Sequence, residues 1–137
     1  MSVLQSTIDY IQTCPYIAEV GPVLTETTDE MGEVAVSPTT RSVIKQYHGG
    51  GAVIEINMAL YLRGHTGDEA DRAENNALLE NFQDWVFEQQ ARRNFPDLGP
   101  GKQAQSISAA NGIPYQYGDD GTATYQVQIK LRYYQGR

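Results

Sequence analysis

The sequence has only one cysteine, Cys14, so no disulfide can form within the chain. No apolar run approaches the roughly 18 residues that a membrane-spanning helix needs, and the first residues lack the basic and apolar regions of a secretory signal. Basic residues are few: 10 Lys and Arg stand against 17 Asp and Glu, a net charge of −7. We therefore expect a soluble protein that folds in a reducing cytoplasm, with no membrane partner and no direct sequence-specific binding to nucleic acid.

Motifs for catalysis and metal binding are also missing. His48-Gly49-Gly50-Gly51 is similar to the oxyanion loop of esterases, but the partner motif Gly-x-Ser-x-Gly is absent, so we interpret these glycines as a turn between strands. His48 and His65 have no metal-ligand spacing with each other or with Cys14, which we interpret as a packing residue. We expect no enzymatic activity, no cofactor and no metal. One alternative of a different class stays open, a small ligand-binding or enzymatic α+β domain whose site uses the two histidines and nearby carboxylates.

The 137 residues are 40% hydrophobic, which predicts a single domain over residues 1–137. Capping-box spacing between Ser2 and Gln5 and an apolar face predict a short helix that ends at Cys14-Pro15. Between residues 16 and 51, β-leaning segments separated by turn signals predict two or three strands, at 17–23, 33–36 and 41–47.

The middle of the chain changes its period. Apolar residues alternate from Ile54 to Leu62, which predicts a strand, and we expect a hairpin from Arg41 to Arg63 that turns at the three glycines. From about Asp68 to Arg93 the spacing is helical, with Leu78, Leu79, Phe82, Trp85, Val86 and Gln89 on one stripe.

The last third predicts an antiparallel meander. Its strands are expected at 102–108, 113–117 and 122–134, with turns at Asn111-Gly112 and Asp119-Asp120-Gly121. The whole order predicts the α+β class, a mostly antiparallel sheet with a short N-terminal helix and one long central helix packed on one face.

Two surfaces are candidate interfaces. One is the polar side of the last strand, which includes one of the nine tyrosines; its residues are Gln126, Gln128, Lys130, Arg132 and Tyr134. The other is the acidic segment 25–33, whose carboxylates are Glu26, Asp29, Glu30 and Glu33. For each residue, a solvated surface role is the competing interpretation.

Several short motifs occur in a fixed order in the second half of the chain. They are Glu74-Asn75-Asn76, Asn81-Phe82-Gln83-Asp84-Trp85, Glu88-Gln89, Pro96-x-Leu98, Gly101-Lys102-x-Ala104-Gln105-x-Ile107 and the ending from Tyr125 to Gln135. This order resembles the minor capsid or tail-terminator proteins of long-tailed bacteriophages and prophages, which serve tail completion and head-tail joining. The resemblance covers most of the chain and is weakest over residues 25–50.

The resemblance implies a structural virion protein of the head-tail junction, made in the host bacterial cytoplasm. It implies a homohexameric ring that caps the tail tube, with the tail-tube protein and the head-tail connector as partners. No catalytic residues come with this resemblance. A connector-side or head-associated minor capsid protein is the alternative within the same class.

Overall fold

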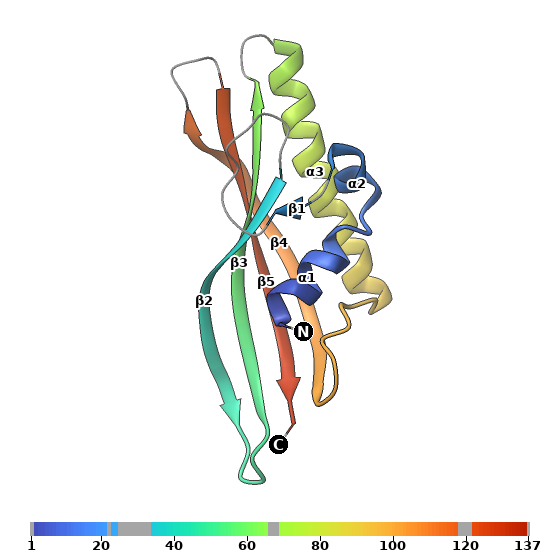
Figure 1. The fold of residues 1–137 in the computed structure, drawn as a ribbon, viewed down its shortest axis with the longest axis vertical. Helices are drawn as coiled ribbons and strands as arrows, with labels where there is room; N and C mark the ends of the chain where they lie inside the picture. Colours follow the sequence, from blue (N-terminus) through green and yellow to red (C-terminus); the bar gives the residue numbers. More distant parts are fainter. Residues whose placement is uncertain (1, 22, 25–33, 66–68, 118–121, 137) are drawn as a thin grey trace.

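The computed structural model describes residues 2–21, 23–24, 34–65, 69–117 and 122–136 (Figure 1). The elements in chain order are α1 (Val3–Ile11), α2 (Pro15–Val20), β1 (Val23–Leu24), β2 (Val34–Gln46), β3 (Ala52–His65), α3 (Glu69–Arg92), β4 (Lys102–Tyr117) and β5 (Thr122–Gln135). The strands form one sheet in the order β1-β2-β3-β5-β4, in which only the two-residue β1 pairs in parallel. The α+β prediction is confirmed.

The centre of the sheet is the antiparallel pair β3 and β5. Their register runs from Ala52↔Gln135 to His65↔Thr122 without a shift. Side chains alternate between the faces of a strand, so one face of this pair is apolar and buried beneath the helices. Its buried residues are Ile54, Met58, Leu60 and Leu62 on β3, and Tyr125, Val127, Ile129, Leu131 and Tyr133 on β5.

The helices cover that face. The stripe predicted for the long helix is confirmed, because Leu79, Phe82 and Val86 are buried against the sheet in one cluster with Ile8 and Ile11 of α1. Polar side chains hold the layers in place. The hydroxyl of Tyr10 donates to the carbonyl of Asn94 at 2.7 Å, and Gln90 Oε1 accepts from the backbone N–H of Ile107 at 2.8 Å.

The prediction of a strand over residues 17–23 is wrong, because Pro15 begins the helix α2 there. Proline fits the first position of a helix, where its fixed φ is suitable and its missing N–H costs no hydrogen bond. The segments 33–36 and 41–47 were expected as separate strands, but residues 34–36 and 41–46 lie on the single strand β2, which has register shifts at Pro38/Thr40 and Val43/Lys45. The hairpin that turns at Gly49–Gly51 is confirmed.

The expected meander is also wrong. Residues 102–108 and 113–117 belong to one strand, β4, and Asn111-Gly112 lies at a register shift between Ala110 and Ile113. An extra residue in one strand bends it without reversing it, which is the geometry of a β-bulge. The expected turn at residues 119–121 falls outside the described residues.

The first prediction concerns Trp85, which lies at the edge of the core and not in its centre. It is half-buried, with its ring 5.2 Å from that of Tyr10 and 6.3 Å from that of Phe82. We expect Trp85→Ala to lower the unfolding free energy by about 2–3 kcal/mol, below the range for a fully buried aromatic. The matched control, Phe87→Ala, removes an exposed ring from the same helix and should change stability by less than about 0.5 kcal/mol in urea melts. Equal losses of unfolding free energy in the two variants would contradict the packing of Trp85 against Tyr10 and Phe82.

The second prediction concerns the end of α3. Arg93 has φ +56°, its N–H donates to the carbonyl of Gln90, and the N–H of Asn94 donates to that of Gln89. This is a Schellman cap with arginine at a position that favours glycine. We expect Arg93→Gly to raise the free energy of unfolding, measured in urea melts, by about 0.5–1 kcal/mol. Arg92→Gly, one residue earlier and still helical, should instead lower it by a similar amount.

Candidate functional site

The face of the sheet opposite the helices carries polar side chains, and we call it the open face. The structure brings all five predicted β5 residues onto it: Gln126, Gln128, Lys130, Arg132 and Tyr134. The register places Glu55, Asn57 and Tyr61 of β3 beside them. The interface role of these residues stays a prediction. The second predicted surface, with Glu26, Asp29, Glu30 and Glu33, lies outside the described residues.

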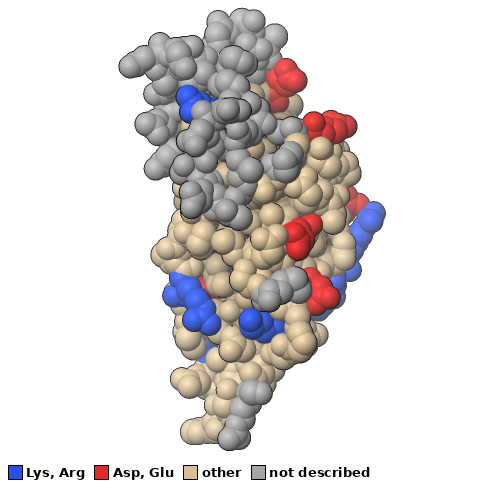
Figure 2. Space-filling view, viewed as in Figure 1, with Lys and Arg blue, Asp and Glu red and all other residues tan. Residues whose placement is uncertain are grey.

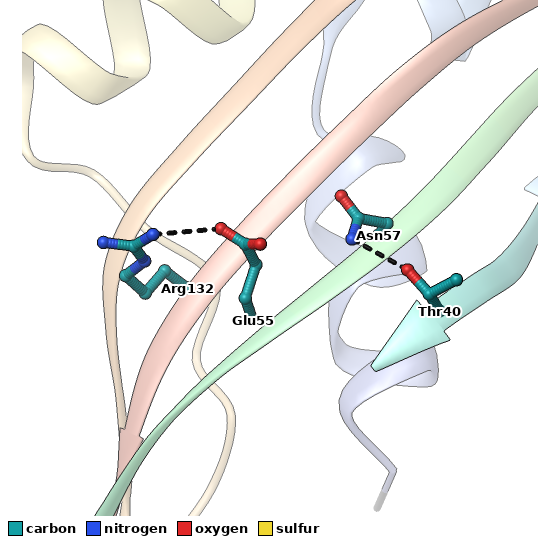
Figure 3. Close-up of polar contacts among 4 residues, drawn as sticks. All are labelled: Thr40, Glu55, Asn57 and Arg132. Carbon is teal, nitrogen blue, oxygen red and sulfur yellow. Dashed lines mark hydrogen bonds and ion pairs between the residues drawn. The ribbon is translucent and has the colours of Figure 1, made fainter. Parts of the chain in front are cut away.

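Cross-strand contacts hold this face in one arrangement (Figure 3). The guanidinium of Arg132 donates to Glu55 Oε1 at 3.1 Å, and the side-chain amide of Asn57 donates to Thr40 Oγ1 at 2.8 Å. The Glu55 side chain is 14% exposed and that of Arg132 is 43% exposed, so the carboxylate is largely covered and the guanidinium reaches solvent. Thr39 Oγ1 also donates to the carbonyl of Asn57 at 3.0 Å, beside the β2 register shift.

One end of the open face is aromatic. The rings of Tyr47 and Tyr134 meet edge-on with centroids 6.1 Å apart, and Lys45 Nζ lies 5.0 Å from the centroid of Tyr47. Gly51 is buried directly beneath Tyr134, and a Cβ atom at this position would overlap the tyrosine ring. Sequence reasoning found the glycine turn but missed this contact, which depends on the strand register.

The charges of the described side chains divide between the two layers. The strands carry Arg41, Lys45, Arg63, Lys102, Lys130 and Arg132, with Glu55 as their acidic residue. The helices carry Asp9, Glu19, Glu74, Glu80, Asp84 and Glu88, with Arg92 as their basic residue. Figure 2 shows most of the acidic side chains on the side of the helices and basic side chains over the lower part of the sheet. The sheet is therefore basic although the whole chain is acidic.

The histidine turn has the geometry of a hairpin loop. The N–H of Tyr47 donates to the carbonyl of Gly51 at 2.8 Å, the N–H of Gly50 donates to that of Tyr47 at 3.1 Å, and Gly50 has φ +101°. Glycine adopts this φ without strain, so the turn interpretation is confirmed. His48 is exposed in this loop, and the side chain of His65 lies outside the part of the chain that the structure describes.

The other candidates for chemistry lie apart from this turn. Cys14 is completely buried, and burial raises the pKa of its thiol. A depression of about 500 Å³ between α2, α3 and the end of β3 is lined by Glu19, Arg63 and Glu74 among others. Among the residues that the structure describes, no group of three or more His, Cys, Asp and Glu is placed to hold a metal ion. In the same ranges, no helix is long and apolar enough to cross a membrane.

The comparisons with known proteins concern the fold. No protein-family model and no curated protein matches the sequence. Among solved structures, a chain of the virion of a native gene transfer agent particle is similar, with a TM-score of 0.58 at 10% sequence identity. The alignment covers 96% of this chain and 93% of that chain. The two chains therefore share a fold over nearly their whole lengths.

The third prediction tests the contact between Gly51 and Tyr134. We expect Gly51→Ala to lower the unfolding free energy by about 1–3 kcal/mol, because the added methyl group overlaps the ring. In a Tyr134→Ala background the same change should cost at least about 1 kcal/mol less. Gly49→Ala is the matched control, since a Cβ there meets no atom within 4 Å. A Gly51→Ala cost that Tyr134→Ala leaves unchanged would contradict the contact.

Proposed function

We propose that this chain is a structural virion protein of a phage-like particle and acts at the head-tail junction as a tail terminator. In this role six copies form a ring that caps the tail tube and joins it to the head connector. The observation that carries the proposal is the fold shared with a gene transfer agent virion chain across 96% of this chain. The ordered motifs from Glu74 to Gln135 support the finer assignment to the tail end of the junction.

The proposed mechanism is assembly and not catalysis. A rigid sheet with an ordered polar face, held by the Arg132–Glu55 and Asn57–Thr40 contacts, is suited to present a fixed surface to a neighbouring ring. A cyclic ring requires head-to-tail contacts between two different surfaces of each copy. The separation of basic strands and acidic helices supplies two such surfaces.

Two alternatives lead to different partners. A connector-side or head-associated minor capsid protein would bind heads and not tail tubes. A ligand-binding or enzymatic domain would use the depression lined by Glu19, Arg63 and Glu74, which offers both charges to a small molecule. The fold shared with a virion chain favours the structural role over this second alternative.

The fourth prediction tests the location in the particle. A tagged copy, expressed in a host that produces the particle, should co-purify with tail tubes, and removal of the native gene should leave overlong tails that are not joined to heads. Static light scattering of the purified protein should show a species of about 91 kDa, six times the subunit mass of 15.2 kDa. Co-purification with empty heads in the absence of tails would support the connector-side alternative and reject the tail-terminator role.

A further inference from the structure

The loop end of the β2–β3 hairpin exposes apolar side chains. Val43 is 58% exposed, Ile44 is 46% exposed and Tyr47 is 42% exposed. Arg41 and Val43 pair with Ile56 and Ile54, so they lie on the face of the hairpin that continues the core side of the sheet, and Ile44 is the extra residue at the next register shift. Lys45 pairs with Val53 and lies on the open face beside the Tyr47 ring. No acidic residue occurs between residues 34 and 54. In Figure 1 this end of the hairpin extends beyond the layer of helices. We call Arg41, Val43 and Ile44 the hairpin patch.

The outer side of α3 has the opposite character. Phe87 is 77% exposed, the highest value among the exposed large hydrophobic residues of the described chain. Glu80 and Asp84 lie on the same side of the helix, because their spacings from Phe87 correspond to two helical turns and one helical turn. Glu88 follows Phe87 directly and forms an ion pair with Arg92 at 2.6 Å. We call Glu80, Asp84 and Phe87 the helix patch. Each patch combines exposed apolar surface with charge of one sign, and the two signs are opposite.

The two patches are too far apart to meet within one subunit. The helix α3 packs over β4 and β3, whereas the hairpin patch lies on β2, toward the opposite edge of the sheet and beyond the helices (Figure 1). Contiguous exposed apolar surface with polar residues at its border marks interaction sites. Charge complementarity between the patches makes a second copy of this chain the partner that fits both.

The hairpin patch can contact a partner through the side chains of β2, because the backbone edge of this strand is not suited to pair with another strand. Within the described strands, β1 pairs only with the first two residues of β2, so the outer edge of β2 beyond Ala35 has no neighbouring strand. However, this edge carries Pro38, two register shifts and Lys45. Proline, bulges and lysine are the features that hinder addition of another strand to a sheet edge.

We propose that the hairpin patch of one copy docks on the helix patch of the next copy, with Val43 and Ile44 against Phe87, and with Arg41 facing Asp84 and Glu80. This inference rests on the proposed function because it assigns the two surfaces through which the ring closes. The contact is heterologous, so it propagates around a ring and is not completed in a two-fold dimer.

The test uses two charge-reversed variants of the full chain. One is Arg41→Glu, and the other is Asp84→Arg. Both side chains are exposed, so circular dichroism and the melting temperature should confirm that both variants fold. Light scattering over a concentration series should show that each variant alone needs at least about tenfold higher concentration than the unmodified chain to assemble.

An equimolar mixture of the two variants should assemble again, because each reversed patch then meets an opposite charge on the other variant. The matched control for the net charge of the helix variant is Asp9→Arg on α1, which should assemble like the unmodified chain. Phe87→Ser removes the apolar part of the contact and should weaken assembly without any change in charge.

The proposal is overturned if the unmodified chain remains at 15.2 kDa throughout the series, or if the mixture does not recover assembly. It is also overturned if the hairpin variant assembles normally but no longer joins tails, since the hairpin patch then binds another virion protein. In that last case co-purification with tail tubes would still support the proposed function, so the two failures are distinguishable.

Discussion

The structure depends first on the pairing of β3 with β5. This register runs from Ala52↔Gln135 to His65↔Thr122 without interruption, and every other layer is positioned by it. A slip of one residue would turn Tyr125, Ile129 and Tyr133 to solvent and would place Lys130 and Arg132 beneath the helices. The cost of burying these charges without partners makes the register unambiguous. The core, the open face and both edges of the sheet therefore follow from a single alignment of two strands.

The parts of the fold that depend on local periodicity were predictable from the sequence. Alternation over residues 54–62 and 122–134, the helical stripe near Phe82 and the glycine turn each involve residues close together in the chain. The wrong predictions arose where local signals are ambiguous. Cys14-Pro15 can end one helix or begin another, and Asn111-Gly112 fits either a turn or a bulge. The position of β5 between β3 and β4 is a long-range choice that no short segment encodes.

The candidate site was predictable only on one strand. Alternation identified the polar side of β5, but its partners come from other strands through the register: Glu55 beside Arg132, and Tyr47 beside Tyr134. The separation of charge was not visible in the net charge of −7, because this sum combines acidic helices with a basic sheet. The predicted apolar stripe of the long helix does not include Phe87, and the structure leaves this ring 77% exposed.

The charge distribution has a consequence for how copies of this chain approach one another. A net charge of −7 on every copy makes the average orientation repulsive, whereas the orientation that brings the hairpin patch to the helix patch is locally attractive. Exposed charges act over roughly 8 Å at physiological ionic strength, so the repulsion selects the orientation during approach and the apolar side chains stabilise it after contact. On the proposed interface, Phe87, Val43 and Ile44 supply affinity while the surrounding charges reject other alignments. In the proposed ring, the angle between successive copies would depend on the rigid sheet that connects the hairpin to α3, and this angle would set how many copies close the ring.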